Sequence, residues 1–290
     1  MRYVVGYAPK NSAQDAMALA AAIAGTQGAS LDIVYVTDDD VPYVALNPQG
    51  NRVSASEQEV LTAERVALDA VPAGIDARFH VRESESVAQG LIEAAAEFDA
   101  GLMVVGATRA GLLGRFALGP VADALLHASP LPVALAPASY RGSAISRLTS
   151  FVGTREGAQA AIDVAIRAAG RRGLPLRFVS LVELDQLTQQ DFDLDSPLSP
   201  ARQHVNSVLA GAAARLPAGE ATATIAHGQS IEEAIESIGW EPGELALIGS
   251  SRLAQKNRLF LGNTAHKVLR ALPVPLVVVP RDFDQPDVLD

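Results

Sequence analysis

The sequence contains no cysteine among its 290 residues. It can therefore form no disulfide, and it offers neither a thiolate ligand for a metal nor a cysteine nucleophile. Basic residues are also scarce, because 23 Lys and Arg stand against 33 Asp and Glu, which gives a formal net charge of -10. No cluster of Lys and Arg is dense enough to offset this charge, so the composition argues against nucleic acid as a partner.

Long apolar runs are missing as well. No stretch approaches the roughly 20 apolar residues that cross a bilayer. The first residues, MRYVVGYAPK, hold too short an apolar run for a signal peptide and lead directly into an expected strand. We therefore expect a cytoplasmic location and no membrane partner, which agrees with the lack of cysteine.

Hydrophobic residues, in contrast, make up 49% of the chain and charged residues only 19%. This balance is typical of a compact α/β protein whose parallel strands are buried on both faces. A chain of 290 residues fits two domains of about 145 residues each.

Strand and helix patterns alternate strictly, and the second half of the chain repeats the order of the first. Such alternation predicts parallel sheets with right-handed crossovers and helices on both faces. The expected strands are 2–8, 30–37, 76–83, 101–107 and 132–137, then 149–155, 176–183, 222–228, 245–251 and 275–281. The expected helices are 14–28, 56–71, 86–98 and 121–129, then 158–170, 200–216, 230–239 and 263–272.

The duplication extends to irregular segments. A polar, proline-containing excursion follows the second strand of each half, at 37–51 and 183–200. A serine-rich linker at 139–147 joins the halves, so we place the first domain at 1–141 and the second at 142–290.

Two loops carry a more specific signal. The stretch MVVGATRAGLLGRFALGPVA at 103–122 has a counterpart, ALIGSSRLAQKNRLFLGNTA, at 246–265, and the first and last glycines of the two are equally spaced. With the Val-Gly near the end of each first strand, these motifs make the whole chain resemble a tandem universal stress protein. The resemblance implies two doubly wound, Rossmann-like parallel sheets with strand order 3-2-1-4-5, packed as a pseudo-twofold dimer. Ligands of such sheets bind at the switch point between strands one and four, where these loops lie.

The nucleotide-binding branch of that family has an Asp at the end of strand one and a loop of the form G-x2-G-x9-G-[S/T]. Glycines let the backbone approach phosphate oxygens, and the following helix offers free N–H groups. In the first half Gly106 and Gly119 match, but Arg109 stands at the middle glycine, Pro120 at the Ser/Thr and Ala8 at the strand-one Asp. Proline lacks the N–H group that a phosphate would use.

The second half departs less from the pattern. Gly249 and Gly262 match, and Arg252 again stands at the middle glycine. Asn263 replaces the Ser/Thr but keeps its N–H group and an amide donor, and Thr264 adds a hydroxyl group. The strand-one Asp is again absent, with Arg155 in its place.

Each of these residues also has a structural interpretation. The four glycines could serve tight strand-to-helix connections at positive φ. Arg109 and Arg252 could clamp a phosphate, fill a vacated pocket with their stems, or lie solvated on the surface.

Catalytic and metal-binding patterns are weak. The five histidines do not recur in the two halves and lack metal-ligand spacing. The acidic runs 38–40 and 191–195 are better explained as solvated loops than as Mg²⁺ sites. Ser250 and Ser251 follow a strand without a G-x-S-x-G elbow, so we interpret them as turn residues and expect no enzyme.

The fifth strands suggest how the halves associate. As the terminal strand in the implied order, each would be an exposed edge unless something covers it. In stress-protein dimers these strands pair with one another, and we expect Val133–Ala136 and Leu276–Val279 to pair antiparallel within this chain. A further homodimer is compatible with this arrangement.

Two functions remain open. The one we favour is a stress-response regulatory or interaction protein with degenerate nucleotide sites, no required cofactor and a protein partner of unknown identity. The alternative is an ATP-binding switch, with weak ATPase activity at most, that uses mainly the C-terminal half through Arg252, Asn263 and Thr264.

Overall fold

The structure is a computed structural model that describes residues 1–9, 11–37, 44–46, 52–110, 115–153, 158–183, 200–217, 220–250, 259–281 and 283. In the first half it has β1 (Arg2–Tyr7), α1 (Asn11–Gln27), β2 (Ser30–Thr37), α2 (Ala55–Asp69), β5 (Ala77–Glu83), α3 (Val87–Glu97), β6 (Leu102–Gly106), α4 (Pro120–Ala128) and β9 (Val133–Ala136). In the second half it has β10 (Arg147–Phe151), α5 (Ala158–Arg172), β11 (Leu176–Glu183), α6 (Pro200–Ala213), β12 (Ala221–Gly228), α7 (Ile231–Glu236), β13 (Glu244–Gly249), α8 (Asn263–Ala271) and β14 (Leu276–Val279). Two short hairpins, β3 (Val44–Leu46) with β4 (Arg52–Ser54) and β7 (Thr108–Ala110) with β8 (Arg115–Ala117), complete the described elements.

The long strands form one ten-stranded sheet in the order β12-β11-β10-β13-β14-β9-β6-β1-β2-β5. Within each half the strands are parallel and follow the order 3-2-1-4-5, so the predicted topology is confirmed. The two predicted sheets are joined edge to edge into a single mixed sheet.

The junction is the expected pairing of the fifth strands. β14 runs antiparallel to β9, with Leu276 opposite Leu135 and Val278 opposite Val133. The side chains of both strands are buried, as β-branched and aliphatic residues are when a sheet is covered on both faces. Each strand thereby covers the free edge of the other.

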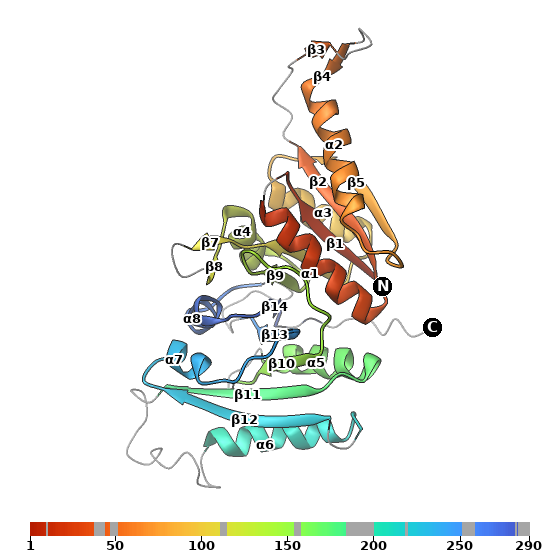
Figure 1. Cartoon of the computed structure of the whole chain (residues 1–290). Coiled ribbons are helices and arrows are strands. Elements are labelled where there is room, and N and C mark those ends of the chain that lie inside the picture. Colours follow the sequence, from red (N-terminus) through yellow and green to blue (C-terminus); the bar gives the residue numbers. More distant parts are fainter. Residues whose placement is uncertain are drawn as a thin grey trace.

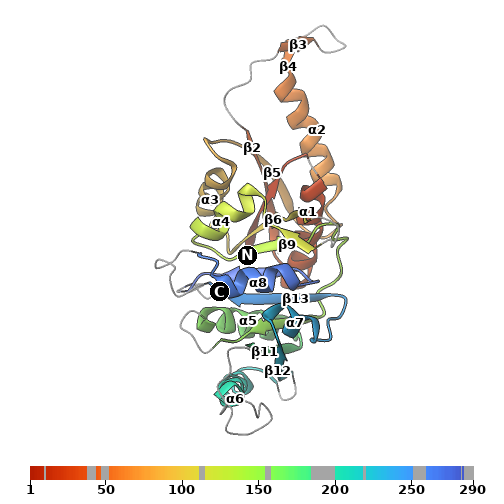
Figure 2. The ribbon, with the colours of Figure 1, turned by 90° about the vertical axis from the view of Figure 1, so that its left-hand side faces the viewer.

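Helices cover both faces of this sheet (Figure 1). Side chains of α1, α2, α5 and α6 pack into one hydrophobic cluster, and those of α3, α4, α7 and α8 pack into a second cluster on the other face. Figure 2 shows the N-terminal half with α1 and α2 on one side of its strands and α3 and α4 on the other. In both views α2 and the β3–β4 hairpin project away from the body.

Local sequence signals set the ends of several helices. Helix α1 ends before Gly28, which has φ 69°, a conformation that favours glycine. Ser86 caps α3 by accepting a 3.2 Å hydrogen bond from the Gln89 N–H group, and Pro120 is the first residue of α4. The predicted pattern at 230–239 proves too long, because α7 ends at Glu236.

Candidate functional site

The two candidate crevices lie at the carboxyl ends of the first and fourth strands of each half. In the first half these are β1 and β6, which pair with Val5 opposite Val104. In the second half they are β10 and β13, which pair with Ser150 opposite Leu247. Strand order reverses at both positions, so the predicted switch points are present.

In the first half the backbone of α1 lies directly on Gly106. A Cβ atom added at Gly106 would stand 2.0 Å from the carbonyl oxygen of Ser12, in the first turn of α1. The residue must therefore be glycine because a helix backbone occupies the space of its missing side chain. This contact explains Gly106 without any ligand.

The loop after Gly106 is folded on itself. It forms the β7–β8 hairpin, in which the Thr108 hydroxyl group donates a 3.0 Å hydrogen bond to the carbonyl oxygen of Ala117. The Thr108 methyl group also faces Gly119, where an added Cβ would lie 2.9 Å from it. Arg109 is the central residue of β7, and its side chain lies outside the described residues.

The rest of the first crevice offers few groups for an anion. Gly119 precedes α4 and provides no side-chain cap, and Pro120 at the start of the helix has no N–H group. Ala8, at the end of β1, supplies no carboxylate for a ribose. The described residues of this half therefore lack the donors that the family motif supplies.

The second crevice is less altered where it is described. Gly249 ends β13, and the next N–H group, of Ser250, donates a 2.8 Å hydrogen bond to the carbonyl oxygen of Val279. Ala107 makes the equivalent 2.8 Å bond to Ala136 in the first half. Ser250, interpreted from sequence as a turn residue, is 4% exposed, and its hydroxyl group has no hydrogen-bond partner in the described part of the chain.

The start of α8 is open in this half. Gly262 precedes the helix without a side-chain cap, and Asn263 and Thr264 in the first turn are exposed. N–H groups in the first turn of a helix have no partner within that helix and are the groups to which an anion binds. Arg252, with the rest of 251–258, lies outside the described residues, and so does Arg155.

The expectation that the four glycines adopt positive φ angles is wrong. Gly119 and Gly262 have φ -76° and -78°, and neither Gly106 nor Gly249 is among the glycines with positive φ. A helix backbone lies close to Gly106 and explains why that residue is glycine. Gly119 and Gly262 each precede a helix and provide no side-chain cap.

Metal-binding groups do not gather in the described part of the chain, where no three His, Asp or Glu residues are placed to hold an ion. The acidic runs 38–40 and 191–195 lie outside it, as does Ser251. Among the described helices none is both long and apolar enough to cross a bilayer.

Comparison with known proteins agrees with this architecture. The sequence profile of the universal stress protein family matches this chain twice, at residues 1–137 and 151–280. The chain belongs to the universal stress protein family. The universal stress protein Rv2319c of Mycobacterium tuberculosis is 28% identical over 304 aligned residues, which cover 97% of this chain and 100% of that protein.

Solved structures place this universal stress protein in the same fold. A universal stress protein from Archaeoglobus fulgidus aligns with 97% of this chain and 98% of its own, at 16% identity and a TM-score of 0.65. A protein from Pseudomonas aeruginosa described as functionally unknown, PA1789, aligns with 97% of this chain at a TM-score of 0.60. Universal stress proteins solved with cAMP and with dAMP align with 48% and 37% of this chain, at TM-scores of 0.33 and 0.27, too partially to place a nucleotide here.

At the amino ends of the strands, opposite the crevices, this universal stress protein buries two carboxylates that no sequence motif indicates. Asp32 on β2 accepts two 2.7 Å hydrogen bonds from the Arg2 guanidinium group, and His80 Nε2 lies 2.9 Å from it. Burial alone would raise the pKa of Asp32, but the hydrogen bonds from Arg2 and His80 outweigh it and hold the pKa below its ordinary value.

The second carboxylate, Glu244 at the start of β13, has a fully buried side chain. It accepts hydrogen bonds from Arg147, Arg177 and the Thr149 hydroxyl group. Burial acts to raise the pKa of Glu244, and the hydrogen bonds from Arg147 and Thr149 overcome it, so the pKa is lowered. These clusters lie at the amino ends of their strands, far from the crevices, and we assign them to stability.

Proposed function

We propose that this universal stress protein acts in a stress response as a regulatory or interaction protein, and that nucleotide binding in its N-terminal half is reduced or absent. The observation that carries the proposal is the contact of α1 with Gly106, where the Ser12 carbonyl oxygen occupies the space beside the loop backbone. The chain itself therefore fills the space that a glycine in a phosphate-binding loop leaves open for a ligand.

The surface of the N-terminal half supports an interaction role. Helix α2 projects from the body, and its side chains include Leu61 at 62% and Val66 at 44% exposure. Large aliphatic side chains on a projecting helix are available to a protein partner. No enzyme activity is part of this proposal, because the described crevice residues form no nucleophile and base pair.

The second candidate function is an adenine-nucleotide switch in the C-terminal half. The exposed first turn of α8, with Asn263 and Thr264, and the unpartnered Ser250 hydroxyl group favour it. These groups could supply the donors that bind a phosphate at a helix N-terminus. Arg252 would add a guanidinium group from the same loop.

The test begins with freshly purified chain, from which heat releases any bound ligand for analysis on a nucleotide column. We expect less than one nucleotide per chain. ATP at a stoichiometry of two per chain would overturn the proposal, because both crevices would then be occupied.

Titration with ATP and Mg²⁺ in a thermal unfolding assay separates the two candidates. A ligand present at a hundred times its dissociation constant stabilises a protein by about 2.7 kcal/mol. We expect no stabilisation for an interaction protein. For a C-terminal switch, the stabilisation should appear in the native chain, decrease in Thr264→Ala, and persist in the matched first-half variant Pro120→Ala.

A further inference from the structure

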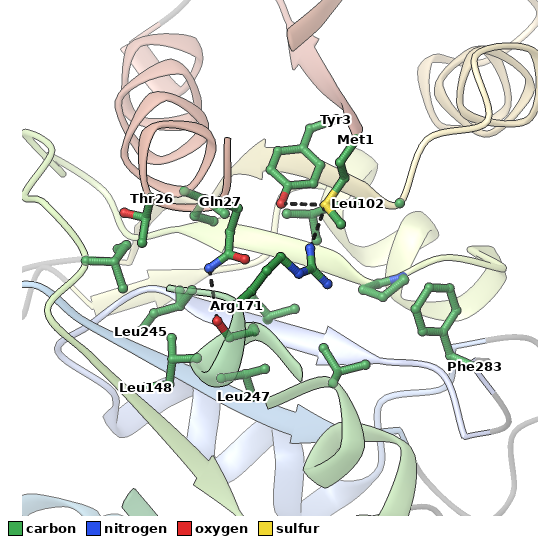
Figure 3. A pocket seen from close by; sticks show the side chains of 17 residues that line it. Met1, Tyr3, Thr26, Gln27, Leu102, Leu148, Arg171, Leu245, Leu247 and Phe283 are labelled. Atoms are coloured by element: carbon green, nitrogen blue, oxygen red, sulfur yellow. Dashed lines mark hydrogen bonds between the residues drawn. The ribbon is translucent and has the colours of Figure 1, made fainter. Parts of the chain in front are cut away.

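We propose that a small cavity between the two halves binds a short branched hydroxy acid, held by its carboxylate at Arg171 and by its hydroxyl group at Gln27. The cavity lies between α1 and α5 and has a volume of about 70 Å³ (Figure 3). It is distinct from both crevices, because no described residue from Gly106 to Gly119 or from Gly249 to Gly262 lines it. The proposal does not depend on whether a nucleotide binds.

The wall of the cavity is largely aliphatic and comes from both halves. Ile23 and Leu102 belong to the first half, and Leu148, Val164 and Leu247 belong to the second. A cavity therefore exists only because the two halves pack together, and an apolar group that enters it leaves water.

Two polar side chains in this lining lack a matching partner. The Arg171 guanidinium group donates to the Met1 Sδ atom at 3.3 Å, and among the described residues it pairs with no carboxylate. A thioether is a weak acceptor, so Arg171 retains its capacity to bind an anion. Figure 3 shows Arg171 reaching from α5 toward Met1.

Gln27 lies across from it on α1. Its Nε2 group donates to the carbonyl oxygen of Ala168 at 3.4 Å. Its Oε1 atom is buried and has no hydrogen-bond partner among the residues that the structure describes. A buried acceptor left unpaired is costly, so a ligand hydroxyl group that donates to it would be favoured.

Tyr3 does not compete with a ligand carboxylate for Arg171. Burial raises the pKa of Tyr3 to about 12 although Arg171 acts in the opposite direction, so its hydroxyl group stays protonated and donates to the Met1 Sδ atom at 3.1 Å. The anion site therefore rests on Arg171, which is an exposed residue.

Size limits the hydrocarbon part of the ligand. An apolar cavity of about 150 Å³ holds benzene, so one of about 70 Å³ holds roughly half as many carbon atoms. An isopropyl group fits this volume. The class that combines such a group with one carboxylate and one adjacent hydroxyl group is the short branched 2-hydroxy acid.

Binding is tested by calorimetry and ligand-observed NMR with 2-hydroxy-3-methylbutanoate. The untagged chain is required, because Met1 and Phe283 near the two termini line the cavity. Three comparison ligands each lack one group: 3-methylbutanoate lacks the hydroxyl group, 2-hydroxy-3-methylbutanamide lacks the charge, and glycolate lacks the hydrocarbon. We expect saturable binding of the full ligand and weaker binding of all three.

Variants locate the site. Arg171→Gln should weaken binding about tenfold or more, as the loss of a charge-assisted hydrogen bond does. Arg172→Gln removes a neighbouring charge on α5 that does not line the cavity. This variant should change the ligand affinity by less than about twofold. Val164→Phe should fill the space and abolish binding, with circular dichroism to verify its fold.

Three results would overturn the proposal. The first is an absence of saturable binding, which would make the cavity a packing gap. The second is binding of glycolate equal to that of the full ligand. The third is equal loss in Arg171→Gln and Arg172→Gln, which would indicate a surface charge effect.

Discussion

At the scale of single residues, each half buries a cluster of charged side chains, but different residues form the cluster in each half. The strand register makes Arg2 equivalent to Arg147, at the start of the first strand of each half. It also makes Asp32 equivalent to Arg177, so the acid of the first half stands where the second half has a base. Glu244, on the fourth strand, restores the charge balance in the second half. Both halves therefore have a buried ion cluster, but its carboxylate lies on the second strand in the first half and on the fourth strand in the second half.

Glu244 is the residue on which the second cluster depends. Glu244→Gln would leave Arg177, whose side chain is 11% exposed, without its ion partner. Breaking a buried pair in this way costs about 3 kcal/mol, measured as the free energy of unfolding in urea. The matched variant Glu241→Gln removes an ion partner of Arg147 that is 64% exposed, and it should cost less than about 1 kcal/mol. Equal costs would contradict a role for burial.

The same cluster gives stability a pH dependence. Because the pKa of Glu244 is lower in the folded chain than its ordinary value, the folded state favours the ionised form. Its contribution is therefore fully present above the ordinary pKa of a glutamate and is lost as the pH falls through the lowered folded value. Urea unfolding between neutral and acidic pH should show a smaller loss in Glu244→Gln than in the native chain. The remaining loss in that variant includes Asp32, whose pKa is lowered in the same way.

Neither cluster could be predicted from the sequence, for a physical reason. Arg2 and Asp32 are 30 positions apart, and Arg147 and Glu244 are 97 apart. Only the parallel register of the strands brings them together, and no local motif records it.

At the scale of elements, the sequence predicted nearly all of the sheet. Alternating apolar runs and helical periods located every long strand and helix, because each is buried on a face that its period sets. The short hairpin of β7 and β8 was missed, since 108–117 reads as a glycine-containing loop and its pairing depends on backbone bonds within the loop. Packing of α1 against β6 was missed for a similar reason. A glycine in a motif does not reveal whether its open side faces a ligand or a helix.

Gly106→Ala distinguishes these two possibilities. The new Cβ would meet the Ser12 carbonyl oxygen at 2.0 Å, so α1 must shift on the sheet. We expect a loss of about 2 kcal/mol or more in the free energy of unfolding, from overpacking against a backbone. The control is Gly211→Ala in α6, where nothing lies within 4 Å of the added atom. That substitution should stabilise the chain by about 0.5 kcal/mol. If Gly106→Ala left stability unchanged, the role of Gly106 would have to be sought in a ligand.

At the scale of the whole molecule, the two halves share a hydrophobic cluster on each face of the sheet. Leu31 of the first half and Phe178 of the second belong to the same cluster of buried side chains, which also includes Ala134 and Val277 from the joined strands. The sheet therefore passes from one half to the other without an uncovered edge. Two domains built in this way should unfold together, because separating them exposes both fifth strands and the aliphatic wall between α1 and α5.

The single tryptophan makes this cooperativity measurable. Trp240 lies in the second half, where it packs near Phe151 at 6.3 Å between ring centroids, so its fluorescence reports on that half. Leu31→Ala removes a fully buried side chain from the first half and should cost about 2–5 kcal/mol. We expect this variant to shift the fluorescence transition in urea as far as the transition followed by circular dichroism. Leu61→Ala, at a side chain that is 62% exposed, should shift neither. If Leu31→Ala shifted the circular dichroism transition but not the Trp240 fluorescence transition, the two halves would unfold separately. The shared core would then contribute little to the association of the halves.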